Sequence, residues 1–388
     1  MSAGFALART HVTIGEVRTT EPHQAVPIEG LVTGYRPWLD GVRAVAVLMV
    51  AAQHTLGVIP VDLGFVGVGL FFALSGYLIT SLLLDERDVR GAVSLSRFYL
   101  RRAARLIPAL VLVVVVCDAL FVILGDYTPL RGSLFALTYS ANYVEVFKGD
   151  WLPAYGPTWT LAVEEHFYIV WPLALLWVVR RWGIRTALRA TLVVCVCALA
   201  WRGALAAMHF RISLIEIGSL ERADALLYGC AAAIAVRLGW RPHQWMLWAG
   251  IAGVATLPVV FHNETYLAAV FAQAALGLAG AAVVVGLDYA PSQWLRRCLS
   301  VPALVTIGVL SYSIYLWHGP LMRAAGDAGF SGRGWRAVAV LVSIAAAAAS
   351  HRYVEAPIRS WARRRSNAPT PGTPTDKIAP ANESVALT

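Results

Sequence analysis

Residues 36–108 contain the stretch that decides the fold: RPWLDGVRAVAVLMVAAQHTLG at 36–57, GFVGVGLFFALSGYLITSLLLDE at 64–86 and SLSRFYLRRAARLIP at 94–108. The apolar runs at 42–59 and 65–84 are each long enough to cross a bilayer as a helix, which needs about 20 residues. Together they predict a transmembrane hairpin. His54 lies inside the first run. Because a polar ring is costly in hydrocarbon, we interpret a histidine at that depth as functional.

Arginines flank this histidine along the chain. Arg43 precedes His54 by eleven residues. That spacing is about three helical turns, so the two side chains share one helix face about 16 Å apart along the axis. A further cluster follows the second apolar run and consists of Arg97, Arg101, Arg102 and Arg105. The stretch therefore predicts a membrane-buried base that faces an anion-binding basic segment.

The composition is that of a polytopic helical membrane protein. Of the 388 residues, 58% are hydrophobic and only 14% are charged, which is too apolar for a soluble chain of this length. We predict an all-α bundle of about ten transmembrane helices around a polar cavity. The expected spans are 42–59, 65–84, 107–124, 158–179, 186–209, 223–238, 245–261, 266–287, 301–322 and 335–353.

Charge sets the expected orientation of these spans. The net charge of +9 comes mainly from arginines beside the spans, which favours anchoring in the lipid bilayer over binding to nucleic acid. By the positive-inside rule, the arginine-rich segment 85–105 is cytoplasmic. Both termini are then expected in the cytoplasm, and the protein in the cell membrane. This count requires residues 130–147 to be re-entrant or interfacial. An eleven-span alternative would place several arginine-rich loops outside.

Three segments are expected: a cytoplasmic tail at 1–35, the transmembrane domain at 36–361 and a disordered cytoplasmic tail at 362–388. Four of the five cysteines lie inside apolar runs, so no disulfide framework is predicted. The spacing of His, Asp and Glu predicts no metal site, and no bound cofactor is expected.

Several motifs together resemble the membrane-bound acyltransferase 3 family. They are LDGVRAVAV and the following QH, GFVGVGLFFALSGYLIT, RFYLRRAARLIPAL, PTWTLAVEEHFYIVWPL, SYSIYLWHGPL and RYVEAPIR, and they extend over about residues 36 to 361. The family moves acyl groups, usually from acyl-coenzyme A, onto sugars, lipids, peptides and antibiotics. The chain departs from the family pattern at Gly69, where Asp is frequent, and at His166, where Gln is frequent.

The resemblance marks His54 as the catalytic base. A neutral imidazole suits the removal of a proton from an acceptor hydroxyl near pH 7. Glu164 and Glu165 lie just inside a later span, and either could act in catalysis by orienting His54 or could bind the acceptor. Adjacent residues differ by about 100° on a helix, so only one of the two is expected to face the cavity. Direct attack is expected, and a route through an acyl-enzyme on Ser75 or His54 stays open.

The remaining candidates bind the two substrates. Arg102 and Arg105 match an Arg-x-x-Arg feature of the family and are expected to hold the phosphates of coenzyme A. Arg43 is expected to hold a phosphate or the acyl carbonyl of the donor. Ser75 and His318 are candidate substrate-binding residues. His318 is also the rival base, although the sequence favours a packing role for it within its span.

The expected function is transfer of an acyl group from acyl-coenzyme A to a hydroxyl of a small molecule or glycan. The basic residues are almost all arginine, which indicates a GC-rich genome and favours a macrolide antibiotic or its sugar as acceptor. A cell-envelope polysaccharide or glycolipid is the alternative acceptor. A membrane transporter or exporter is the alternative of a different class, with the same polar groups forming a proton and anion relay.

Overall fold

The computed structural model describes residues 35–56, 62–149, 151–260, 265–289 and 292–367. Over these residues the chain forms helices and connecting turns without a strand, which confirms the predicted all-α class. The α-helices are α1 Pro37–Leu56, α2 Leu63–Arg90, α3 Leu95–Leu124, α4 Leu130–Leu137, α5 Ala141–Lys148, α6 Trp159–Trp182, α7 Ile184–Ala207, α8 Ile212–Ile217, α9 Ala223–Arg237, α10 Gln244–Val260, α11 Gln273–Tyr289, α12 Gln293–Leu299, α13 Pro302–Asp327, α14 Arg333–Ser350 and α15 Ala356–Asn367. A 3₁₀ turn, η1 Gly156–Thr158, precedes α6, and π-helical turns, η2 Ala268–Ala272 and η3 His351–Glu355, adjoin α11 and α15.

Each predicted span coincides with a helix over its described residues. Within the described residues, six helices are long and apolar enough to cross a membrane, and seven if the pair α12 and α13, bent by 61°, is counted as one span. Helices α9 and α10 have only 15 and 17 residues. Helix α1 carries polar side chains at both ends. The chain is therefore a multi-pass membrane protein, and the count of ten spans stays a prediction.

The lengths of α4 and α5, the start of α3 and the end of α15 bear on the expected spans and domain limits. Helices α4 and α5 have eight residues each, and a helix of about 12 Å is too short to cross a bilayer. This agrees with the expectation that 130–147 does not span. Helix α3 begins already at Leu95, so the arginine cluster lies on its first turns rather than in a loop. Helix α15 continues to Asn367, past the domain end predicted at 361, and the rest of that tail lies outside the described residues, as does the tail at 1–34.

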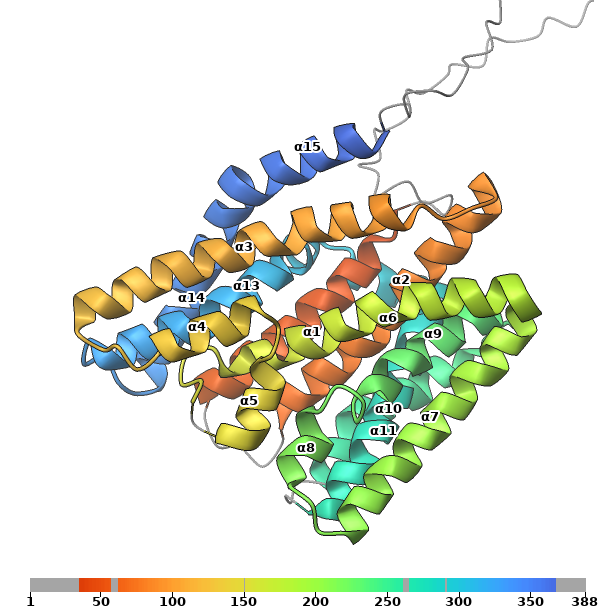
Figure 1. Cartoon of the computed structure of the whole chain (residues 1–388), viewed down its shortest axis with the longest axis horizontal. Coiled ribbons are helices and arrows are strands. Elements are labelled where there is room, and N and C mark those ends of the chain that lie inside the picture. Colours follow the sequence, from red (N-terminus) through yellow and green to blue (C-terminus); the bar gives the residue numbers. More distant parts are fainter. Residues whose placement is uncertain (1–34, 57–61, 150, 261–264, 290–291, 368–388) are drawn as a thin grey trace, which may run out of the picture.

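Helix α2 is central and packs against α1, α9 and α11. Figure 1 shows α1 and α2 in the middle of the bundle, α7 along one edge and α15 outside α3. Two glycines permit the approach of α2 to α9. A Cβ at Gly76 would lie 1.9 Å from the carbonyl oxygen of Leu226, and a Cβ at Gly229 would lie 1.9 Å from that of Ala73. Helices in a bilayer associate by close packing of small residues, so this contact depends on both glycines.

Helix α1 also packs along α13, and this contact positions the site. Near the start of both helices, a Cβ added at Gly308 would lie 1.9 Å from the carbonyl oxygen of Asp40. Near the other end of the contact, His54 of α1 meets His318 of α13. The glycine allows the two backbones to approach closely, which brings side chains far apart in sequence into one part of the bundle.

A buried ion pair joins α7 to α9. Nη2 of Arg202 lies 2.5 Å from Oδ2 of Asp224, and both side chains are fully buried. Nη1 of Arg202 also donates to the backbone carbonyl of Glu221 at 3.0 Å. Removing either partner would leave an unpaired charge inside the membrane domain, so the pair ties the two helices together.

Candidate active site

Two histidines from distant parts of the chain meet inside the bundle. Nε2 of His318 lies 3.3 Å from Nδ1 of His54, and the ring centroids are 5.0 Å apart. His318 is only 1% exposed, and His54 is half-buried. The sequence marked each of them as a candidate but did not predict their contact. We refer to His54 and His318 as the histidine pair.

Backbone carbonyls determine which ring nitrogen carries a proton. Nδ1 of His54 lies 3.0 Å from the carbonyl oxygen of Val50, and Nδ1 of His318 lies 2.6 Å from that of Tyr315. A carbonyl oxygen only accepts, so each Nδ1 carries a hydrogen and donates it. Nε2 of His318 is then an acceptor, and it shares the single Nδ1 hydrogen of His54 with the carbonyl oxygen of Val50. Of the two unprotonated nitrogens, Nε2 of His318 accepts within the pair, so Nε2 of His54 is the one that can serve as a base.

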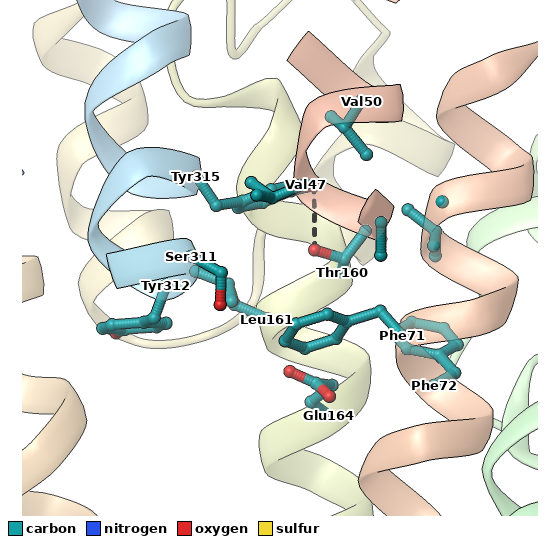
Figure 2. Close-up of a pocket in the computed structure, with 13 residues that line it drawn as sticks. Val47, Val50, Phe71, Phe72, Thr160, Leu161, Glu164, Ser311, Tyr312 and Tyr315 are labelled. Carbon is teal, nitrogen blue, oxygen red and sulfur yellow. Dashed lines mark hydrogen bonds between the residues drawn. The ribbon is translucent and has the colours of Figure 1, made fainter. Parts of the chain in front are cut away.

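A narrow cavity of about 30 Å³ begins one helical turn from the histidine pair. Val50 and Tyr315, whose carbonyl oxygens accept from the two histidines, both line it. Figure 2 shows Phe71 from α2 and Tyr315 from α13 on opposite sides of this space, with Glu164 of α6 at one end. Most of the lining is apolar, so the cavity suits an apolar group.

A second cavity, of about 110 Å³, contains the arginines that the sequence singled out. Arg43, Arg102 and Arg105 line it together with Arg101 and Ser75. We call it the arginine-lined cavity. Because α1, α2 and α3 meet here, residues from three segments of the predicted hairpin region lie around one space.

Two of these arginines are held by acidic or aromatic partners. Nη1 of Arg43 donates to Oδ1 of Asp40 at 2.9 Å. Nη2 of Arg102 donates to Oε1 of Glu165 at 2.6 Å, and its guanidinium carbon lies 3.4 Å from the ring centroid of Tyr168. A guanidinium carries five N–H donors, so each of these contacts fixes the group while donors remain for a ligand.

The two cavities share three lining residues, Phe71, Glu164 and Tyr312. Glu164 is 7% exposed, and its Oε1 accepts from the hydroxyl of Tyr168 at 3.2 Å. A carboxylate therefore lies where the arginine-lined cavity meets the narrow cavity. The two cavities are therefore adjacent, and the histidine pair lines neither of them.

Glu164 and Glu165 do not occupy the position beside His54 that was expected for a carboxylate orienting its ring. The hydrogen-bond partners of His54 in the described residues are Val50 and His318, so the structure gives the orienting position to His318 rather than to either glutamate. Glu164 faces both cavities, whereas Glu165 pairs with Arg102. Their assignment to catalysis stays a prediction.

Two further sequence candidates lie away from the histidine pair. Ser75 lines the arginine-lined cavity close to Glu164. His166, where the chain departs from the family pattern, is half-buried, with Nδ1 2.7 Å from Oγ of Ser219. Among the described residues, no group of three or more His, Cys, Asp or Glu side chains is placed to hold a metal ion.

Tyr315 joins two helices beside the narrow cavity. The hydroxyl of Tyr315 accepts from Oγ1 of Thr160 at 2.9 Å and donates to the carbonyl of Pro157 at 2.7 Å, which ties α13 to the start of α6. The motif SYSIYLWHGPL contains Tyr315 and His318 three residues apart, on one helix face. The sequence offered that spacing, but it did not predict that Tyr315 would line the narrow cavity.

These features define a polytopic membrane protein with two contacting histidines inside its bundle and an arginine-lined cavity. A family model described as "Acyltransferase domain" matches residues 36–351. The chain belongs to this membrane-bound acyltransferase 3 family, as its motifs indicated.

Curated relatives share the same region. The chain is 32% identical over 353 residues to "Peptidoglycan O-acetyltransferase OatA" of Listeria monocytogenes, a match that covers 84% of this chain and 56% of the relative. It is 28% identical over 361 residues to "O-acetyltransferase OatA" of Staphylococcus aureus, which covers 84% and 57% of the two chains. The chain thus spans a little over half the length of these relatives. No solved structure matches it.

Proposed function

We propose that this protein transfers an acetyl group from acetyl-coenzyme A to a hydroxyl of a cell-envelope glycan. The observation that carries the proposal is that the arginine-lined cavity shares lining residues with the narrow cavity, whose lining residue Val50 accepts a hydrogen bond from His54. Family membership supports acyl transfer, and a relative named for peptidoglycan O-acetylation favours the glycan, the alternative acceptor, over a macrolide.

The arginine-lined cavity is suited to the donor. Coenzyme A carries a pyrophosphate and a 3′-phosphate, and guanidinium groups bind such anions through charge-assisted hydrogen bonds. Arg43, Arg101, Arg102 and Arg105 all line this cavity. By the positive-inside rule, this end of the bundle faces the cytoplasm, where coenzyme A is found.

The narrow cavity favours a short acyl group. Its volume of about 30 Å³ favours a short group such as acetyl over a long chain. Val47, Val50 and Phe71 line it and would contact the methyl group. In this arrangement the thioester extends from the arginines past Glu164 toward the histidine pair, while the nucleotide end stays among the arginines.

The chemistry follows from the tautomer of the histidine pair. Nε2 of His54 takes the proton from the acceptor hydroxyl while the hydroxyl oxygen attacks the thioester carbonyl carbon. The imidazolium that forms is stabilised by donation from Nδ1 to Nε2 of His318. The carbon–sulfur bond then breaks, the thiolate of coenzyme A leaves and takes up a proton, and the ester remains on the acceptor.

Substitution of His54 tests the assignment. Membranes containing the His54→Ala variant should release no free coenzyme A from acetyl-coenzyme A above background when peptidoglycan fragments are supplied as acceptor. The matched control is His243→Ala, because His243 is exposed in the turn before α10. The protein should elute from size exclusion as the wild type does in both variants. Release by His54→Ala at the wild-type rate would remove the central assignment.

The covalent alternative has its own test. A two-step route through Ser75 would place the nucleophile in the arginine-lined cavity. A Ser75→Ala variant that keeps the wild-type rate supports direct attack, and a radiolabelled acetyl group that stays on the denatured wild-type protein but not on the variant supports the covalent route. A transporter, the competing class, would move acetylated or glycan substrates only in sealed vesicles and would not release free coenzyme A in detergent.

A further inference from the structure

A large apolar cavity lies apart from the proposed active site. It has a volume of about 370 Å³ and lies between α6, α7 and α9. Val170, Trp171 and Val178 of α6 line one side, and Ala190 and Val194 of α7 line the other. It shares no lining residue with the narrow cavity or the arginine-lined cavity.

This cavity is open on its side to the surface of the bundle. Val170 is 62% exposed, Val194 is 49% exposed and Leu220, at its edge, is 69% exposed. Helices α6 and α7 are both long and apolar enough to span a membrane. In a bilayer the opening therefore faces hydrocarbon rather than water. We call this cavity the lateral groove.

Hydrocarbon is the occupant that physical chemistry favours. An apolar space of this size does not hold ordered water, which needs several polar partners. Left empty, the lining would lose its dispersion contacts. The lining extends along α6 from His166 to Val178, which is about 18 Å at 1.5 Å per residue. That length is close to one leaflet of the hydrocarbon core, about 15 Å, so it suits a single lipid acyl chain.

The two ends of the lateral groove differ in polarity. At one end Nδ1 of His166 pairs with Oγ of Ser219, which itself accepts from Nδ2 of Asn142 at 2.9 Å, so that end is closed by a satisfied polar group. At the other end Arg181 follows Val178 by three residues on the same helix face. Arg181 is exposed, and no carboxylate within the described part of the chain forms an ion pair with it.

We propose that the lateral groove binds one acyl chain of an anionic glycerophospholipid, with the lipid phosphate at Arg181. The guanidinium supplies charge-assisted hydrogen bonds to the phosphate, and the apolar walls of α6 and α7 contact the chain. The lipid enters from the leaflet on the side where α6 ends and α7 begins. This inference is independent of the acyl-transfer reaction, because it concerns different residues and a different ligand.

The test compares retained lipid in variants of the full chain. The purified protein is incubated with detergent-solubilised phosphatidylglycerol, and bound lipid is counted by native mass spectrometry. Ala190→Trp fills the lateral groove, whereas Ala200→Trp, on an exposed position of the same helix, leaves it open. The proposal expects one retained phosphatidylglycerol in the wild type and in Ala200→Trp, and its loss in Ala190→Trp. Retention in Ala190→Trp at the wild-type level would overturn it.

The headgroup is tested separately with a variant that leaves the walls intact. Arg181→Gln should reduce the preference for phosphatidylglycerol over phosphatidylcholine about tenfold, because one charge-assisted contact is lost. Arg180→Gln, at the adjacent position, is the matched control and should keep the preference. An unchanged preference in Arg181→Gln would overturn the anionic assignment. If Ala190→Trp does not fold, as judged by size exclusion, Ala174→Leu in the opposite wall replaces it, and full retention there overturns the groove assignment.

Discussion

Replacing His318 by leucine removes the acceptor that faces Nδ1 of His54 but leaves the Val50 carbonyl in place. In the proposed mechanism the lost hydrogen bond is one that strengthens as His54 becomes an imidazolium. A hydrogen bond to a charged group contributes about 1.5–3 kcal/mol, which corresponds to a decrease in kcat of about tenfold to hundredfold. Loss of His54 itself removes general-base catalysis, which contributes about 10²- to 10⁴-fold.

A second substitution separates this role from packing. Glutamine at 318 offers an amide oxygen that can accept from Nδ1 of His54, and it should recover most of the rate that leucine loses. The assay is the initial rate of free thiol release from acetyl-coenzyme A, in detergent, with peptidoglycan fragments as acceptor. His318→Leu and His318→Gln are compared at matched protein concentration and after matched size-exclusion profiles.

Two results would refute the reasoning. The first is a rate for His318→Leu within about twofold of the wild type, since about 0.4 kcal/mol is far below the worth of a charged hydrogen bond. The second is an equal loss in both variants together with an equal fall in melting temperature. That outcome would make His318 a packing residue, as the sequence alone favoured.

Other predictions concern the donor, the acyl group and the fold. Arg105→Gln should raise KM for acetyl-coenzyme A by about tenfold or more. It should leave KM unchanged for acetyl-pantetheine, which lacks the pyrophosphate and the 3′-phosphate. Equal effects on both donors would contradict a role of Arg105 in binding phosphate. Val50→Ala, which widens the narrow cavity, should increase the rate with butyryl-coenzyme A relative to acetyl-coenzyme A by about tenfold, measured as competing esters on one acceptor. Gly76→Ala should abolish recovery of folded protein, because its Cβ would lie 1.9 Å from a carbonyl oxygen, whereas Gly203→Ala, with no atom within 4 Å, should leave the melting temperature unchanged or slightly higher. Hydrogen bonds from Thr128 and Arg323 hold the pKa of Asp126 below its ordinary value. The contribution of Asp126 to stability is therefore full above about pH 4 and is lost as the pH falls through its native pKa. Asp126→Asn should lower the melting temperature at pH 7, and the difference from wild type should shrink below about pH 4.

The sequence was sufficient to predict the class of fold and to single out several residues that line the arginine-lined cavity. Hydrophobic run length predicts helices well, and each of the ten runs is helical over its described residues except one or two at an end. Arg43, Ser75, Arg102 and Arg105 lie near one end of a short hairpin and the helix that follows it, so their proximity follows from chain connectivity. Their roles in binding the donor stay predictions.

The histidine pair could not be predicted in this way. His54 and His318 are 264 residues apart, and their contact depends on how α1 packs along α13. That packing is set by features such as the approach of Gly308 to Asp40, which leave no periodic signal in the sequence. The partner of Glu165 was missed for a similar reason, because its ion pair with Arg102 joins α6 to α3 across the bundle.

The small size of the narrow cavity has an electrical consequence. A continuous column of water between the arginines and the histidine pair would conduct protons across a membrane, where each charge gains about 2.3 kcal/mol per 100 mV. A space of about 30 Å³, walled mainly by valine, phenylalanine and tyrosine side chains, leaves room for few water molecules and offers them few polar partners. The residues that would select a short acyl group would therefore also hinder proton movement between the two sides of the membrane, so turnover need not dissipate the ion gradients of the cell.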